Sequence, residues 1–308
     1  MSRQKIIVIL GQTSTGKSDF AVEIAKLING EIISADSRQV YKGMNLGTGK
    51  ITKKEMRGVP HHLLDVASPH QVFSVNDFQK IANKKIAEII KKGKIPIICG
   101  GTGFYIDSIV NGTIFPKVPP NKTLRAKLKK LSLIELNQYL EKLDPSRFKT
   151  IDKNNHVRLI RAIEIAKTLG KVPSINEGSL GFPQRPSFLK IGLTLPPEIL
   201  KERINNRLLA RLKKGMLREI ENLHKNGLSW KRMKALGLEY RYGALYLQNK
   251  ILKDEMIQKI NSESWYYAKR QKTWFKRDQN IIWVNPTKNK EKNIALKTVK
   301  EFLKENPF

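Results

Sequence analysis

The sequence predicts an α/β protein, with a parallel-sheet core around a phosphate-binding loop (P-loop) and a mostly helical insertion domain. Three observations lead to this prediction. A short apolar strand, a glycine-containing loop and a helix-prone stretch follow one another at the start of the chain. Further apolar stretches of strand length alternate with amphipathic helical stretches, as in parallel sheets. Between 116 and 190, short basic helical stretches replace that alternation.

The first strand and the loop after it make a phosphate-binding motif. Ile6–Leu10 is apolar and rich in isoleucine, which is typical of a buried strand. Glycines then let backbone N–H groups converge on phosphate, while Lys17 supplies a charge and Ser18 a hydroxyl that can ligate Mg²⁺. The motif fits G-x-x-x-x-G-K-[ST], and all of its residues are predicted to contact an oligophosphate: Gly11, Gln12, Thr13, Ser14, Thr15, Gly16, Lys17 and Ser18. Taken alone, this motif indicates ATP.

The second predicted strand, which starts at Gly30, ends in polar side chains. Ligands of open parallel sheets bind beyond the carboxyl ends of the strands, so Asp36 and Ser37 are expected near the phosphate-binding loop. A carboxylate there can accept a proton from an incoming nucleophile, which makes Asp36 the candidate general base. The alternative is an Asp that supports Mg²⁺ indirectly or stabilises the local structure.

The next features bear on metal binding and hydrolysis. The pair His61-His62 lacks the i, i+4 spacing of a zinc-binding helix and is interpreted as packing or positioning residues. Ser74–Asp77 has the pattern of a capping box and predicts the start of a helix. Ile95–Cys99 predicts a third strand, but a glycine pair follows it where a motor or transport ATPase needs a carboxylate. The site is therefore predicted to be poorly equipped to hydrolyse a nucleoside triphosphate.

Prolines at 116, 119 and 120 mark a change of domain. Helices are expected in the insertion at Lys122–Lys130, Ser132–Leu143 and Asn155–Leu169. The predicted domains are a catalytic core at 1–115 and 191–285, a helical insertion at 116–190, and a C-terminal helix or tail at 286–308.

The core is expected to resume with a strand at Phe188–Leu195 and one long helix at Pro197–Lys225. Beside its apolar stripe, this helix carries Arg203, Arg207 and Arg211. Arginines that border an apolar face suit bidentate contacts with phosphate, and a merely solvated face is an equally good interpretation.

The last part of the core mixes aromatic and basic residues. Trp265–Arg277 ends a predicted helix, and its aromatic side chains can stack on bases or pack in the core. Core packing is favoured for them. Ile281–Val284 predicts the final strand.

The composition indicates a polyanionic partner. The 308 residues include 58 Lys and Arg against 27 Asp and Glu, a formal charge of +31. Such an excess favours attraction to nucleic acid, although a lysine-rich proteome would also produce it. The single cysteine, Cys99, excludes a disulfide framework, and no apolar run approaches the roughly 20 residues that span a bilayer. Because the chain enters a strand at once, no signal peptide is expected, and we predict a soluble, cytoplasmic, monomeric protein.

Seven segments together resemble one family, the bacterial-type tRNA dimethylallyltransferases, also called tRNA isopentenyltransferases. They occur in the order of that family, at 11–18, 32–44, 47–50, 60–65, 100–105, 158–162 and 269–275. The Asp-Ser segment that continues to Tyr41, Lys42, Gly43 and Met44 is far more specific than the P-loop. The resemblance covers roughly residues 6 to 284.

The resemblance implies a reaction. A dimethylallyl group would pass from dimethylallyl diphosphate to N6 of the adenosine 3′-adjacent to the anticodon in tRNA, and diphosphate would be released. The P-loop, with Mg²⁺ at Ser18, would then hold the diphosphate rather than ATP. By analogy, the catalytic residues would be Asp36, which accepts the N6 proton, with Lys17, Ser18 and Arg207.

The resemblance also implies a set of tRNA contacts. The insertion would bind the anticodon stem-loop of tRNA by shape and phosphate contacts. The implied contact residues are Asp36, Ser37, Arg38, Gln39, Thr102, Arg125, Val157, Arg158, Leu159, Ile160 and Arg161. Two alternatives belong to other classes: a P-loop nucleotide or nucleic-acid kinase that uses ATP, and a non-catalytic RNA-binding protein with a decayed P-loop.

Overall fold

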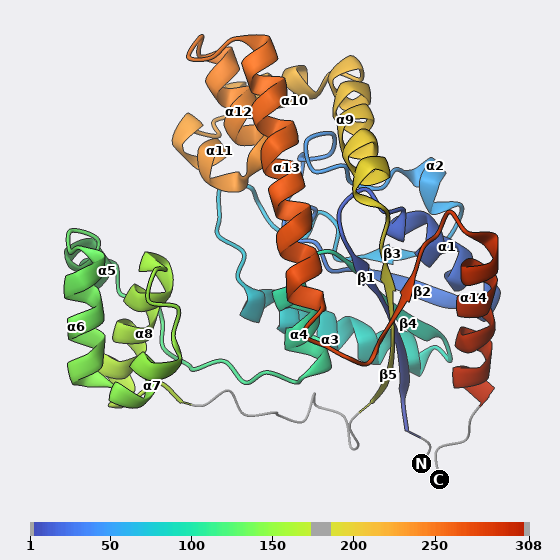
Figure 1. Ribbon diagram of the computed structural model, residues 1–308, viewed down its shortest axis with the longest axis horizontal. Helices are drawn as coiled ribbons and strands as arrows, with labels where there is room; N and C mark the ends of the chain where they lie inside the picture. Colours follow the sequence, from blue (N-terminus) through green and yellow to red (C-terminus); the bar gives the residue numbers. More distant parts are fainter. Residues whose placement is uncertain (1–2, 174–185, 305–308) are drawn as a thin grey trace. The chain divides into compact units, whose positions relative to one another are not determined.

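A six-stranded parallel sheet forms the centre of the computed structural model, which describes residues 3–173 and 186–304 (Figure 1). Its strand order is β3-β2-β4-β1-β5-β6, and each neighbouring pair is parallel. The strands are β1 (Lys5–Gly11), β2 (Gly30–Ser34), β3 (His61–His62), β4 (Ile95–Gly100), β5 (Ser187–Leu193) and β6 (Ile281–Val284). The predicted α/β class with a parallel sheet is confirmed.

The two faces of the sheet are covered by different helices (Figure 1). Side chains alternate along a strand, so Ile6, Val8 and Leu10 of β1 pack on one face and Ile7 and Ile9 on the other. The first face packs against α3 (Val75–Lys91), α4 (Gly103–Val110) and α13 (Lys253–Phe275), and the second against α1 (Lys17–Ile28) and α14 (Asn289–Lys304). Burial on both faces explains why the strand is a continuous apolar run.

Local signals determine where several of these helices begin and end. The capping box predicted at Ser74 is present, since its hydroxyl accepts from the Asp77 N–H and the Asp77 carboxylate accepts from the Ser74 N–H. A similar capping box at Thr52 begins the short helix α2 (Lys53–Met56). Of the C-terminal segment predicted at 286–308, α14 is helical and 305–308 lies outside the described residues.

The single helix predicted for Pro197–Lys225 is wrong. The chain forms α9 (Pro197–Lys213) and α10 (Met216–Lys225), because Gly215 between them has φ 96°, in the left-handed region. Two further helices that were not predicted, α11 (Trp230–Leu236) and α12 (Leu238–Leu247), pack beside α13.

A second compact unit, Gly112–Gly178, is separate from the unit made by Met1–Asn111 and Ser179–Phe308. It contains α5 (Lys122–Leu128), α6 (Leu133–Leu143), α7 (Pro145–Thr150) and α8 (His156–Leu169) around its own leucine and isoleucine core. The three predicted helices of the insertion are confirmed, whereas α7 was missed. Residues 174–185 of the predicted insertion lie outside the described residues.

Among the helices of both described ranges, none has the length and apolar character needed to cross a bilayer.

Candidate functional site

A cavity of about 380 Å³ opens beyond the carboxyl ends of β1, β2 and β4. The P-loop forms one wall, with Gly11 and Gly16 at φ 134° and 88°. A Cβ on Gly11 would overlap the backbone oxygen of Leu193 in β5, so glycine is required for this close approach. The loop ends at the N-terminus of α1, where the backbone N–H groups favour a bound anion.

Two cations from distant parts of the sequence face this cavity. The Nζ of Lys17 donates to the backbone oxygen of Gln12. The Arg207 guanidinium of α9 donates to Thr13 Oγ1 and to the Gly49 oxygen, each at 3.2 Å. Both cations therefore hydrogen-bond to neutral oxygens of loops beside the cavity.

The electrostatic environment of these cations is unusual. Burial, opposed by Cys99 and assisted by Arg207, lowers the pKa of Lys17 to about 8. Burial and the neighbouring Arg211 lower the pKa of Arg207 to about 10. In the part of the chain that the structure describes, no ion pair neutralises Lys17 or Arg207, whereas Arg211 pairs with Glu239 at 3.0 Å. Half-buried cations without an ion-pair partner indicate a site for an anion.

Asp36 also lines this cavity, immediately after β2. Its Oδ1 accepts the backbone N–H of Arg38 at 2.8 Å and of Gln39 at 3.3 Å, which fixes the turn that follows the strand. The Ser37 N–H donates to Thr102 Oγ1 at 3.0 Å. The structure thus brings the Asp-Ser segment, the Gly-Gly-Thr turn and the P-loop to one cavity.

Gln271 of α13 is a residue of this site that sequence reasoning did not single out. Its Oε1 accepts the Thr13 N–H and its Nε2 donates to the Gly101 oxygen, both at 2.8 Å. A Cβ on Gly101 would overlap the amide of Gln271. The sequence drew attention to Trp265–Arg277 for its aromatic and basic residues, and to 269–275 through the resemblance, but neither signal pointed to Gln271 itself. Tyr267, one turn earlier, also lines the cavity, and burial together with Asp36 raises its pKa to about 12.

The end of β4 and the histidine pair complete the surroundings. Burial raises the pKa of the Cys99 thiol to about 12, so this thiol stays protonated. His62 Nε2 lies 2.7 Å from a carboxylate oxygen of the buried Glu31. Among the residues that the structure describes, no group of His, Cys, Asp and Glu side chains is placed to hold a metal ion. His61 Nδ1 lies 2.9 Å from the Val59 oxygen, and the ring lines the cavity.

The remaining predicted tRNA contacts lie in the second unit. Arg125 Nη2 and Nε donate to the two oxygens of Glu164 at 2.7 and 2.9 Å, and Arg161 also pairs with this carboxylate. Although burial alone would raise the pKa of Glu164, hydrogen bonds from Arg125, the Asn121 N–H and Arg161 lower it to about 2. The arginine side chains are still 35% and 34% exposed, so they can also reach a ligand.

The segment 157–161 divides between surface and core. Val157 is 75% exposed and the Arg158 side chain 55%, whereas Leu159 and Ile160 are buried in the core of the second unit. The buried pair supports α8, and only the exposed side chains are available to a ligand.

The chain is similar to known proteins over most of its length. The family model "IPP transferase" matches residues 39–278. The chain is 45% identical to tRNA dimethylallyltransferase 2 of Treponema denticola over 283 residues, 91% of this chain and 94% of the relative. It is 39% identical to tRNA dimethylallyltransferase of Acetivibrio thermocellus over 303 residues, 97% of each.

Solved structures give the same result for the fold. The full-length tRNA isopentenylpyrophosphate transferase of Bacillus halodurans matches with a TM-score of 0.72 at 34% identity, over 98% of this chain and 99% of that chain. A eukaryotic dimethylallyltransferase acting on tRNA matches with a TM-score of 0.79 over 99% of this chain and 81% of that chain; at 23% identity, this likeness concerns the fold.

Proposed function

The chain belongs to the IPP transferase family, and on that premise we propose that it transfers a dimethylallyl group from dimethylallyl diphosphate to N6 of the adenosine 3′-adjacent to the anticodon in tRNA. Diphosphate is the second product. The kinase and the non-catalytic alternatives are set aside, because the relatives over nearly the whole chain are dimethylallyltransferases.

One observation supports this function above the others. A P-loop, two half-buried cations and the Asp36 carboxylate line a single cavity, while β4 ends without a carboxylate beside it. An alkyl transfer needs an anion site for the leaving group and a proton acceptor for the nucleophile. The transfer needs no activated water, so the reaction does not require the carboxylate that ATPases carry at the end of this strand for hydrolysis.

The roles follow from the positions of the side chains. The adenosine N6 attacks C1 of the dimethylallyl group, the N6–C1 bond forms, and the electron pair of the C1–O bond leaves with the diphosphate. Lys17, Arg207 and the N–H groups of the P-loop stabilise the charge that develops on this leaving group. Asp36 accepts the N6 proton; its Oδ1 already holds the turn at Arg38, which fixes the direction of the carboxylate.

The site also suits Mg²⁺. Magnesium bound to phosphates keeps several waters and needs only one or two protein oxygens, and the Ser18 hydroxyl at the cavity wall is such an oxygen. Bound there, the ion would neutralise charge on the diphosphate. Binding of pyrophosphate, measured with and without Mg²⁺ in the absence of tRNA, tests this assignment separately from activity.

We assign the tRNA contacts to both units. In the catalytic core, the turn Asp36–Gln39 and Thr102 hold the target adenosine, which must leave the stacked loop to reach the cavity. In the insertion, Arg125, Arg161 and the exposed side chains of 157–158 contact the anticodon stem-loop. The protein acts as a cytoplasmic monomer.

The decisive experiment omits ATP. Purified protein is incubated with unmodified tRNA, Mg²⁺ and labelled dimethylallyl diphosphate, and label in tRNA and free diphosphate are both measured. Equal amounts of label in the adenosine 3′ of the anticodon and of diphosphate are expected. Absence of labelled tRNA, or a requirement for ATP, would overturn the proposed function.

A further inference from the structure

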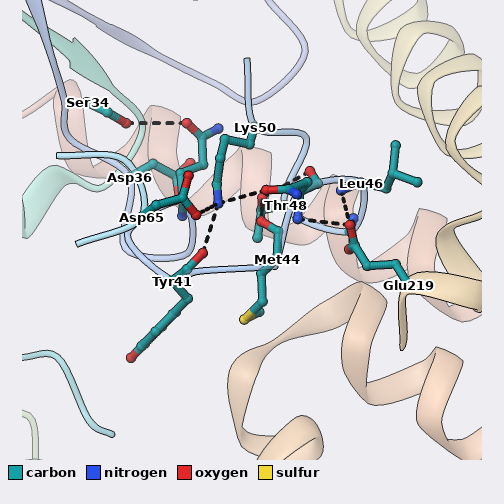
Figure 2. A network of polar contacts seen from close by, with 12 residues as sticks. Ser34, Asp36, Tyr41, Met44, Leu46, Thr48, Lys50, Asp65 and Glu219 are labelled. Carbon is teal, nitrogen blue, oxygen red and sulfur yellow. Dashed lines mark hydrogen bonds and ion pairs between the residues drawn. The ribbon is translucent and has the colours of Figure 1, made fainter. Parts of the chain in front are cut away.

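The Glu219 carboxylate accepts hydrogen bonds from the backbone of a loop. The loop, residues 44–50, lies between the Asp-Ser segment and α2 in the chain. Figure 2 shows Leu46 of this loop beside Glu219. The Oε2 atom of Glu219 accepts the backbone N–H of Asn45 at 3.0 Å and of Leu46 at 2.7 Å, and Oε1 accepts that of Gly47 at 3.1 Å. A carboxylate with three backbone donors is a strong, directional anchor.

The position of Glu219 is set by the break between α9 and α10. Gly215 ends the first helix, and Glu219 stands in the first turn of the second, where a negative charge is favourable. The hydroxyl of the buried Tyr240 in α12 donates to Oε1 at 2.7 Å and fixes the carboxylate from the other side.

The far end of the 44–50 loop is held by Lys50, whose side chain is only 5% exposed. Its Nζ donates to the Tyr41 oxygen at 2.8 Å, to Asn45 Oδ1 at 3.0 Å and to Asp65 Oδ1 at 2.5 Å, as Figure 2 shows in part. The loop is therefore fixed at both ends.

The loop places one backbone oxygen in the site. The Gly49 oxygen accepts from the Arg207 guanidinium at 3.2 Å and from Gln39 Nε2 at 3.3 Å. A Cβ on Gly49 would overlap Arg207 and Arg211, so the loop backbone lies directly against these guanidinium groups. Movement of the loop would therefore move Arg207.

We propose that Glu219 is a positioning residue for the leaving group: by holding the 44–50 loop it fixes the Gly49 oxygen, which directs Arg207 toward the diphosphate. This inference rests on the proposed function, because it takes Arg207 as a diphosphate contact. Glu219 does not touch the substrate in this scheme.

The test uses Glu219→Gln in the full-length protein, with inorganic pyrophosphate and Mg²⁺ as the probe. Glutamine has the same shape but only one acceptor oxygen. Its NH₂ group is a donor and would face an N–H group of the loop, so the hydrogen bonds made by one of the two carboxylate oxygens are lost. Pyrophosphate affinity is expected to fall about tenfold, the equivalent of one hydrogen-bonded contact to a charged group. Affinity for tRNA should stay within about twofold, since this loss acts through Arg207 alone.

Two control variants separate positioning from general stability. Glu221→Gln makes the same chemical change at an exposed position of α10, where the partner is Lys225, and should leave pyrophosphate binding unchanged. Tyr240→Phe removes one hydrogen bond to Glu219 but keeps the three loop N–H bonds, so it should lower the melting temperature without the tenfold loss. An equal loss of pyrophosphate affinity in Glu221→Gln would overturn the inference.

A double-mutant cycle with Arg207→Ala gives the strictest test. If Glu219 acts through Arg207, then Glu219→Gln should cause no further loss of pyrophosphate affinity in the Arg207→Ala background. Additive losses, or unchanged affinity in the folded single variant, would overturn the inference. Should Glu219→Gln not fold, Glu219→Asp, which keeps the charge but is shorter, enters the same cycle.

The outcome is distinguishable from failure of the proposed function. Wild-type protein that binds pyrophosphate but does not prenylate tRNA would overturn the function. If the wild-type protein prenylates tRNA but the losses of pyrophosphate affinity in Glu219→Gln and Arg207→Ala are additive, only the role of Glu219 is overturned.

Discussion

The two units each contain a carboxylate beside two cations, but they pair these charges in opposite ways. In the second unit, Arg125 and Arg161 both converge on the buried Glu164, whose pKa falls to about 2. In the cavity of the first unit, Lys17 and Arg207 bond to neutral oxygens, and their pKa values fall instead. Removing one partner from a paired cluster destabilises the fold, even where the exposed parts of Arg125 and Arg161 can still contact a ligand. Half-buried cations without a carboxylate partner instead indicate a place for an anionic ligand.

The largest effect is expected from Asp36→Asn. The amide oxygen can still accept the N–H groups of Arg38 and Gln39, so the turn is kept while the proton acceptor is lost. Turnover should fall about a thousandfold, in the range of general-base catalysis, with tRNA affinity retained. Single-turnover transfer and a tRNA-binding assay measure the two quantities. The exposed Asp254→Asn is the matched control, and an Asp36 variant with normal turnover would remove Asp36 from the base role.

Glu164→Gln should affect stability instead. Replacing the carboxylate leaves Arg125 and Arg161 without their counter-charge. Because these side chains are partly solvated, the second unit should lose about 2 kcal/mol of stability at neutral pH, less than for a fully buried pair. Because the folded pKa lies below the usual value of 4.5, the wild-type contribution is complete above pH 4.5 and is lost as the pH falls toward 2. Hydrogen exchange of the α8 amides at pH 7 reports the loss.

The exposed Glu141→Gln on α6 serves as the control for this change. Equal protection of α8 in the two variants would contradict the structural reading of the Glu164 cluster.

Lys17→Met should separate binding from stability. Pyrophosphate affinity should fall about thirtyfold, as for the loss of one hydrogen-bonded contact between charged groups. The melting temperature should not fall, since the charged form of Lys17 is disfavoured by burial in the folded protein. Calorimetry of binding and of unfolding tests both statements, with the exposed Lys26→Met as control. If Lys17→Met lowers the melting temperature and Lys26→Met does not, then the Lys17 charge stabilises the first unit, as the Glu164 cluster stabilises the second, and the contrast between the two units is wrong.

The smallest effect is the pH dependence of pyrophosphate binding. Free Lys17 loses its proton as the pH rises through about 8, whereas the bound anion favours the protonated form. Binding therefore takes up a proton above pH 8, and affinity should fall by about tenfold per pH unit there. Isothermal titration between pH 7 and 9, below the pKa of about 10 for Arg207, measures the slope, which should be absent in Lys17→Met. An equal slope in that variant would assign the dependence to another group.

Local patterns predicted much of the core correctly. The strands and the P-loop depend on short apolar runs and on glycines, and the helix start at Ser74 depends on residues three positions apart. The break at Gly215 was missed because Leu200, Ile204, Leu208 and Leu212 keep a helical period up to it, and one glycine was given too little weight.

The contacts that complete the site join residues far apart in the chain. Leu46 and Glu219 are separated by 173 positions, and Thr13 and Gln271 by 258. Periodicity within one segment carries no information about such pairs, and the mixed aromatic and basic composition of Trp265–Arg277 did not distinguish Gln271 from its neighbours. Arg207 was singled out from a stripe of three arginines, and the structure places it at the cavity. Its contact with the diphosphate stays a prediction.

The pairing of β1 with both β4 and β5 has a consequence for synthesis of the chain on the ribosome. The P-loop motif is complete after Ser18, but β5 begins at Ser187 and the Gln271 bridge comes from the last long helix before β6. A nascent chain that has not yet emerged to Gln271 has the sequence motif without the architecture that holds it. We therefore expect capture of the first substrate to follow synthesis of the chain through α13, and products truncated before Gln271 to bind diphosphate more weakly than the full chain.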